Sequence, residues 1–201
     1  METSKAKEIL GKNLIGPQEL SGISNPFSPR LPEAVPEIPF SEKEIEEKHG
    51  SHILVLCPRE FRDGTDITIA TIREKIALCG RNPRFYNQDW YLRESFIHVS
   101  LEEKWLLASK KLLDESRAMP VDKVVSAYKL KSAVELTFAF FANYFVNDGE
   151  KLWNNDYIWC SDTDNNGDQI YVGRYTDLSG LNADGFEIHR HLKIKKNYGV
   201  V

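Results

Sequence analysis

The sequence is poor in features that define several large classes of protein. It has only three cysteines, Cys57, Cys79 and Cys160, and none forms a CxxC pair or a Cys/His cluster. Disulfide frameworks belong to short, cysteine-dense secreted chains, so we expect reduced, mostly buried thiols. The first ten residues also lack an apolar core of signal-peptide length. Both observations predict a cytoplasmic protein.

Long hydrophobic runs and a strong charge excess are missing as well. The most apolar segment, 133–146, carries Glu135 and Asn143 and is shorter than the roughly 20 residues that span a bilayer. The net charge of −4 gives no electrostatic reason to expect nucleic acid or an anionic membrane as the main partner. No GxSxG, HExxH, Walker or dinucleotide-binding motif is present, so no reaction can be assigned from a motif.

Proline is concentrated at the N-terminal end of the sequence. Six of the nine prolines lie in residues 1–40. Because proline fixes φ and lacks an amide donor, long helices and central strands are not expected there. Scattered apolar residues argue against a purely solvated linker. We therefore expect 1–40 to be an extended arm, with a short helix in the first dozen residues, around a single α+β domain at 41–201. A partner-binding arm is the alternative.

The first half of this domain contains sequence signals that mark where helices and a strand begin and end. Capping-box patterns predict helices over 41–49 and 101–117. The continuous apolar run 52–57 predicts a strand covered on both faces. Thr68 caps a predicted helix over 69–79. The aromatic-rich stretch 82–99 fits no single element.

The second half is built around a predicted β-hairpin. Two runs rich in Tyr, Trp, Ile and Val, 157–161 and 169–175, flank a polar turn with Asn-Asn-Gly at its centre. A nearly all-round apolar helix precedes them, over 130–146, and is expected to be central in the core. Residues 185–195 alternate apolar and polar, which predicts a further strand with one wet face. The apolar end of the sequence, 198–201, suggests a last strand in the sheet. We expect two or more helices on a mainly antiparallel sheet ending in a C-terminal β-meander.

The hairpin turn resembles the start of a calcium-binding loop, D-x-D-x-N-G. Its oxygen-bearing side chains stand at alternate positions: Asp162, Asp164, Asn166 and Asp168. Hard oxygen ligands and a bending glycine are what Ca²⁺ requires. The twelfth position, however, is Gly173 where such loops carry Glu. A plain hairpin turn is the alternative, because Asp, Asn and Gly are also turn residues.

Two histidines share one side of the last long predicted strand. His189 and His191 point the same way, with Arg190 opposite. Two imidazoles could share a metal ion or act as acid and base. We favour a polar strand face that contacts water, because the sequence offers no identifiable third ligand. Arg190 could be a structural charge paired with a carboxylate or a ligand anchor. With Arg174, these residues are the candidate ligand-binding side chains.

Several short segments in the last third form a familiar order. The pattern joins KSAVE at 131–135, GEKLW at 149–153, YIWCSD at 157–162, VGRY at 172–175 and GVV at 199–201. It resembles an uncharacterised bacterial protein family and, more remotely, C-type-lectin-like (formylglycine-generating-enzyme-like) domains. The resemblance implies a compact α+β domain that displays variable loops for binding. Cys160 stands alone, so the catalytic cysteine pair of the formylglycine-generating enzymes has no counterpart.

Two main hypotheses for the function follow. The first is a non-enzymatic binding domain of a bacterial protein, with a face formed by the 162–168 turn, the 176–184 loop and the outward histidines. Its partner would be an unknown protein or a small polar ligand, and no cofactor is expected apart from Ca²⁺ at the turn. The second is a metal-dependent hydrolase or nuclease-like enzyme, whose Asp162, Asp164, His189 and His191 would have to converge on one pocket. A structural protein of an assembly or prophage is a third alternative.

Overall fold

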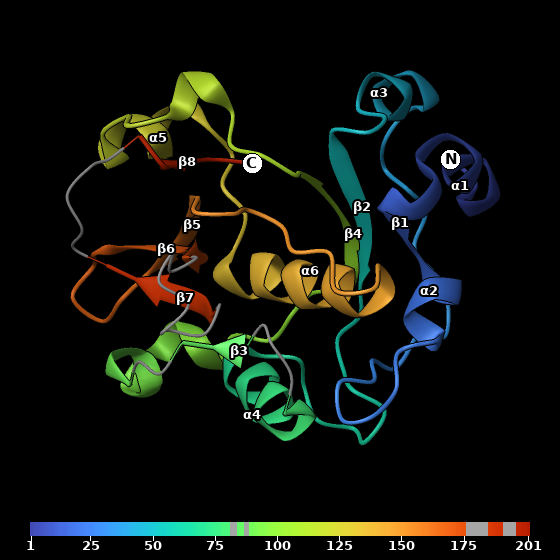
Figure 1. Ribbon diagram of the computed structural model, residues 1–201, viewed down its shortest axis with the longest axis horizontal. Helices are drawn as coiled ribbons and strands as arrows, with labels where there is room; N and C mark the ends of the chain where they lie inside the picture. The colour runs from blue at the N-terminus through green and yellow to red at the C-terminus, as the bar shows by residue number, and fades with distance from the viewer. Residues whose placement is uncertain (81–83, 87–88, 176–184, 191–195) are drawn as a thin grey trace.

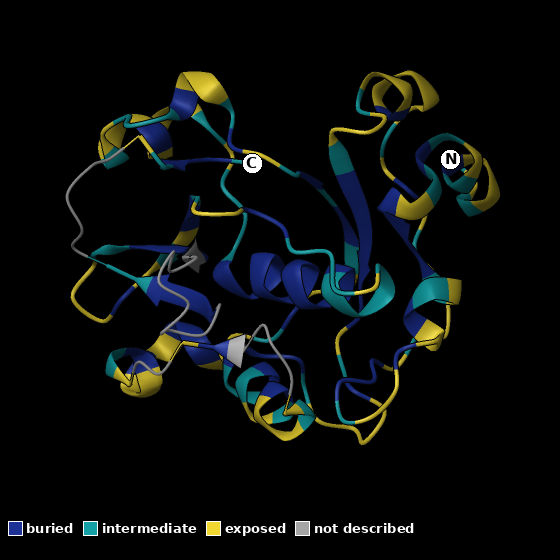
Figure 2. Cartoon of the chain, in the orientation of Figure 1, coloured by how far each residue is buried: buried dark blue, intermediate teal, exposed yellow. Residues whose placement is uncertain are grey.

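The chain has an α+β fold in which one helix lies between two sheets. The computed structural model describes residues 1–80, 84–86, 89–175, 185–190 and 196–201. Helix α6 (Ala133–Val146) runs between a three-stranded and a five-stranded sheet and contacts strands of both (Figure 1). It is buried from Ala133 to Asn143 (Figure 2). The predicted central helix is therefore confirmed. It begins later than residue 130, because Ser132 and Glu135 form a capping box at its start.

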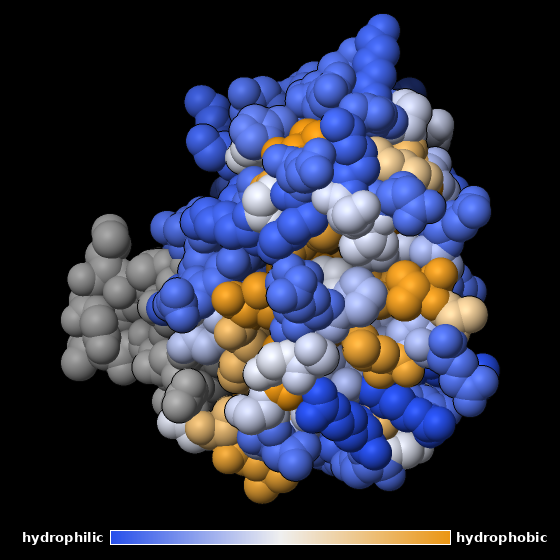
Figure 3. Space-filling model, turned by 90° about the vertical axis from the view of Figure 1, so that its right-hand side faces the viewer, coloured by the Kyte–Doolittle hydropathy of each residue, from blue (hydrophilic) through white to orange (hydrophobic). Residues whose placement is uncertain are grey.

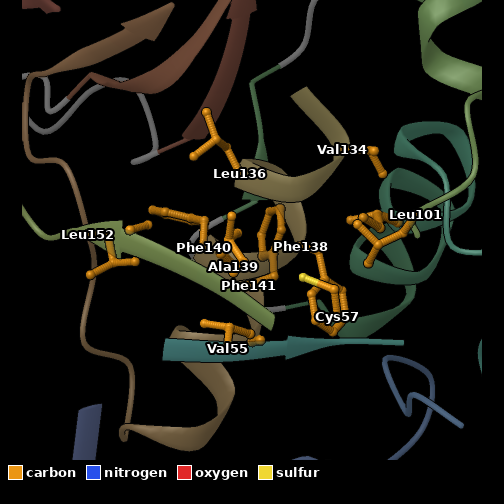
Figure 4. Close-up of a cluster of buried hydrophobic side chains, with 14 of the residues drawn as sticks. Val55, Cys57, Leu101, Val134, Leu136, Phe138, Ala139, Phe140, Phe141 and Leu152 are labelled. Carbon is orange, nitrogen blue, oxygen red and sulfur yellow. The ribbon is translucent and has the colours of Figure 1, made fainter. Parts of the chain in front are cut away.

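The phenylalanines of α6 join the two halves of the core. Figure 4 shows Phe138, Phe140 and Phe141 among apolar side chains that include Val55 and Cys57 of the three-stranded sheet. On the other side, the Phe140 ring lies 4.8 Å from that of Phe186 in the five-stranded sheet. A helix with apolar residues nearly all round its circumference suits this position, because each sheet takes one side of it.

The N-terminal segment forms its own elements and packs into the same core. They are α1 (Thr3–Leu10), a 3₁₀ turn (Gly11–Asn13), β1 (Leu14–Ile15), α2 (Pro17–Ser21) and, after the prolines, α3 (Glu42–Glu47). The expected short N-terminal helix is present as α1. Apolar side chains of residues 1–40 are buried, among them Leu10, Ile15 and Phe27. The outer side of this region, seen in Figure 3, is mainly hydrophilic, with apolar residues in separate patches.

The three-stranded sheet corrects one prediction. Its order is β1–β2–β4, with β2 (His52–Cys57) parallel to β1 and antiparallel to β4 (Lys104–Ser109). The strand over 52–57 is confirmed, but the helix over 101–117 is wrong. The capping-box pattern after Ser100 is a local signal, and pairing with β2 outweighs it by burying both Trp105 and Leu106, which point to opposite faces.

The five-stranded sheet contains the predicted hairpin. Its strands, in spatial order, are β3 (Arg84–Phe85), β7 (Gly185–His189), β6 (Gln169–Tyr175), β5 (Tyr157–Thr163) and β8 (Tyr198–Gly199). The three central strands are antiparallel and the two outer ones are parallel to their neighbours. The hairpin and the last strand are confirmed, while residues 191–195 of the predicted strand lie outside the described residues.

The face of this sheet that points away from α6 is covered as well. Helix α5 (Val121–Ala127) packs there on a second apolar cluster formed by Val124, Tyr157, Trp159, Tyr171, Tyr198 and Val200. The prediction that the Glu187 and His189 face contacts water is therefore wrong for Glu187, which is only 6% exposed. Alternation of side chains identified the two faces, but it could not show that a helix covers the second one.

A helix and three 3₁₀ turns complete the described elements. Helix α4 (Ile69–Cys79) confirms the prediction: Thr68 caps it and Gly80 ends it in the left-handed conformation. Three further 3₁₀ turns are Trp90–Arg93, Ser95–His98 and Asp114–Ser116. Among the described residues, no helix is both long and apolar enough to cross a membrane.

Candidate functional site

The predicted calcium turn is filled by an arginine side chain. The main-chain N–H groups of Asn166 and Asp168 donate to Asp164 Oδ1 at 2.8 and 2.9 Å. Arg190 donates to the other oxygen, Oδ2. Both oxygens of Asp164 are therefore occupied, and the guanidinium of Arg190 supplies the positive charge that a calcium ion would otherwise bring.

Arg190 also ties the turn to the preceding 3₁₀ segment. Its guanidinium lies 3.4 Å from Glu94 Oε1 and 4.5 Å from the centre of the Trp90 ring. Glu94 in turn accepts a hydrogen bond from the main-chain N–H of Asn165 at 2.7 Å. We call this group, Trp90, Glu94, Asp164, Asn165 and Arg190, the Arg190 clasp.

The electrostatics of the clasp match this arrangement. Burial works to raise the pKa of Asp164, but hydrogen bonds from Asp168 N, Arg190 and Asn166 N outweigh it and lower that pKa. The carboxylate is thus held in its charged form. Of the two roles predicted for Arg190, the geometry matches the structural charge paired with a carboxylate.

Asp162 points to a different place. Its Oδ2 accepts from the main-chain N–H of Ala133, at the start of α6, at 2.6 Å. Burial raises the pKa of Asp162, and the nearby Glu135 adds to the effect. The glycine at the twelfth loop position also has a structural reason, because a Cβ on Gly173 would lie 2.2 Å from the main-chain oxygen of Asp156. Within the described ranges, no three His, Cys, Asp or Glu side chains are grouped to hold a metal ion.

His189 lies in a half-buried cluster beside the second apolar core. Glu187 Oε2 accepts from Tyr157 Oη at 2.5 Å and lies 3.0 Å from His189 Nε2. Burial, followed by the Glu187 carboxylate, raises the pKa of Tyr157. The His189 ring stacks on Tyr171. His191, the 176–184 loop and the side chain of Arg174 lie outside the described residues.

A pocket of about 710 Å³ opens elsewhere, between β4 and the start of α6. We call it the β4 pocket. Its apolar lining comes from several segments: Pro39, Phe40, Val99, Trp105, Leu106, Leu107, Leu130 and Val134. Its volume falls within the range of small-molecule sites, and mainly apolar walls with a few polar groups are typical of such sites.

One lysine forms ion pairs with both glutamates that line the β4 pocket. Lys104 Nζ lies 2.5 Å from Glu135 Oε1 and 3.0 Å from Glu102 Oε2. Glu135 is buried, and its other oxygen accepts from the Ser132 N–H at 2.5 Å. Burial would lower the pKa of Lys104, but the hydrogen bonds to the two glutamates outweigh it and raise that pKa.

Two further lysines give the pocket lining a small excess of positive charge. Lys131 donates to the main-chain oxygen of Val201, and burial lowers the pKa of its ammonium group. Lys129 also lines the pocket and is exposed. Three lysines against two glutamates give the lining a formal net charge of +1, which favours an anionic group on any ligand.

Sequence reasoning missed the β4 pocket because it assigned β4 to a helix. The sequence did contain usable signals. Ser132-Ala-Val-Glu135 is a capping box that marks the start of α6, and Lys129-Leu-Lys131 places two cations directly before it. Neither signal shows that β4 lies opposite, because β4 pairs with β2, almost 50 residues earlier in the chain.

No family model, curated protein sequence or solved structure matches this chain. The resemblance to C-type-lectin-like domains therefore stays a prediction.

Proposed function

We propose that this chain is a non-enzymatic binding domain, and that the β4 pocket holds a ligand with an apolar body and an anionic group. The observation that carries the proposal is the combination of apolar walls with three lysines and two glutamates in one pocket of about 710 Å³. Binding rather than catalysis is also what the resemblance to C-type-lectin-like domains implies.

The metal-dependent hydrolase is less well supported. It requires Asp162, Asp164, His189 and His191 around one pocket. Asp164 instead binds Arg190, and Asp162 binds the start of α6. His189 pairs with Glu187 in a third place. No contact among the described residues favours a reaction centre at these side chains.

An anionic apolar dye tests the proposal. We expect 8-anilinonaphthalene-1-sulfonate to bind the native protein saturably, with a rise in dye fluorescence. Val99 lines the pocket and is 48% exposed, so its substitution should leave the fold intact. Val99→Glu should weaken dye binding at least fivefold, whereas Val99→Lys should keep or strengthen it.

Leu78 provides the matched control. It is 75% exposed, lies on α4 and does not line the pocket, so Leu78→Glu should bind the dye like the wild type. Equal weakening in Leu78→Glu and Val99→Glu, or no saturable binding by the wild type, would contradict the proposal.

A further inference from the structure

We propose that the ligand of the β4 pocket is an extended polypeptide segment of a partner protein, which adds to the free edge of β4 as a further strand. Such a segment would carry apolar side chains and an acidic residue. This inference rests on the proposed function, because it specifies what the same pocket binds.

The pocket faces the edge of β4 rather than one of its faces. Among the described residues, β4 is the edge strand of its sheet, and β2 is its neighbour. Four consecutive residues of this strand, Lys104, Trp105, Leu106 and Leu107, line the pocket. Consecutive side chains of a strand point to opposite faces, so a pocket that touches all four lies along the edge.

The hydrogen-bond pattern shows which main-chain groups point into this space. Ser109 lies opposite His52, so Lys110 lies opposite Ser51, and the Lys110 N–H donates to the Ser51 oxygen at 2.9 Å. Bonded and non-bonded pairs alternate along antiparallel strands. The N–H and C=O groups of Trp105, Leu107 and Ser109 therefore point away from β2.

An independent contact supports this alternation. The Ser109 oxygen accepts from the indole N–H of Trp153 at 2.9 Å, on the side away from β2. Trp105 and Leu107 have no such partner for these main-chain groups in the part of the chain that the structure describes. A strand edge with unpaired N–H and C=O groups is a template for another extended chain.

The opposite wall has a similar character. Lys129, Leu130, Lys131 and Ser132 are consecutive and also line the pocket. Lys131 forms a parallel bridge with Cys160, and its oxygen accepts from the Ser161 N–H at 2.9 Å. In an extended segment, main-chain groups alternate in direction, so those of Leu130 point away from β5 and toward the pocket.

These observations favour a peptide over a lipid or another small apolar anion. Main-chain donors and acceptors on both walls would stay unpaired next to an acyl chain, whereas a peptide backbone would satisfy them. The charge is complementary to an acidic peptide, since the three lysines of the lining outnumber its two glutamates.

The first test uses a defined pool of acetylated, amidated hexapeptides. Positions 2, 4 and 6 would carry Val, Ile, Leu or Phe, position 3 Thr, and positions 1 and 5 Asp or Thr. The pool is incubated with the full chain, and retained peptides are identified by mass spectrometry after gel filtration. We expect retention of peptides that contain Asp. If no peptide is retained, the inference is wrong, and saturable dye binding in the preceding test would show that the proposed function still stands.

The second test examines the backbone contacts of the best retained peptide. Each amide is N-methylated in turn, and binding is measured by fluorescence anisotropy. Strand addition predicts at least a tenfold loss at alternate positions, where the amide faces β4, and smaller losses between them. A loss that does not alternate, or no loss, would overturn the inference.

The third test separates charge from fold. Lys129→Glu should weaken binding of the Asp-containing peptide at least threefold and leave binding of its Asp→Asn form unchanged. Lys43→Glu on α3 is the control, because Lys43 is highly exposed and does not line the pocket. Equal weakening in both variants would contradict the role of Lys129.

Discussion

The Arg190 clasp and the β4 pocket differ in how far their polar groups are already satisfied. In the clasp, both oxygens of Asp164 are taken by Arg190 and by main-chain amides, and Glu94 holds Asn165. In the β4 pocket, lysines outnumber glutamates, and main-chain groups of Trp105 and Leu107 lack partners among the described residues. A dense run of polar residues therefore indicates a binding site only where its hydrogen-bond donors and acceptors are not already paired within the protein.

The largest expected effect comes from breaking the clasp. Arg190→Met would leave the buried Asp164 and Glu94 without a cation, and we expect a loss of about 3 kcal/mol in the free energy of unfolding, measured in urea. Arg30→Met, which removes an exposed pair with Glu60, should cost less than about 1 kcal/mol. If the two variants were equally stable, the clasp would not be a structural element.

A smaller effect should follow from Glu135→Gln beside the β4 pocket. The variant loses the charged partner of Lys104 and weakens the cap at Ser132, so we expect a cost of about 1.5 kcal/mol in urea unfolding. The same change makes the pocket more positive, and dye binding should tighten about twofold. Weaker dye binding in this variant would argue against an anionic ligand.

The pKa of His52 reports on the positive charge near the pocket. Burial, and then Lys48 and Lys131, lower the pKa of His52 to about 4. The unfolded chain takes up this proton near pH 6.5 and the folded chain only near 4, so stability should fall as the pH falls between these values. Lys131→Gln should raise the His52 pKa, measured by NMR, and flatten this decline in melting temperature. An unchanged His52 pKa in this variant would show that the Lys131 ammonium group does not lie close enough to act on His52.

The smallest expected effect is that of calcium. Because Arg190 binds Asp164, millimolar calcium should leave the melting temperature of the wild type unchanged. A rise in melting temperature with calcium, and not with magnesium, would show that the turn binds the ion despite the clasp.

Elements with local signals could be predicted from the sequence. The helix over 69–79 has its cap at Thr68 and its stop at Gly80, and the hairpin has its turn residues in the right place. Strand β4 could not be predicted, because pairing with a distant strand overrode a helical start signal. The partners of Arg190 were equally hidden, since Asp164 and Glu94 lie 26 and 96 residues away in the chain.

Helix α6 has a consequence for dissecting this protein. Its Phe138 ring stacks on Phe27, near the start of the chain, and its Phe140 packs against Phe186, near the other end. If the two halves of the chain were expressed separately, each would therefore expose an apolar surface and tend to aggregate. The two halves should instead be co-expressed, so that each covers the apolar surface of the other. One half, and with it one sheet, can then carry an isotope label that the other lacks.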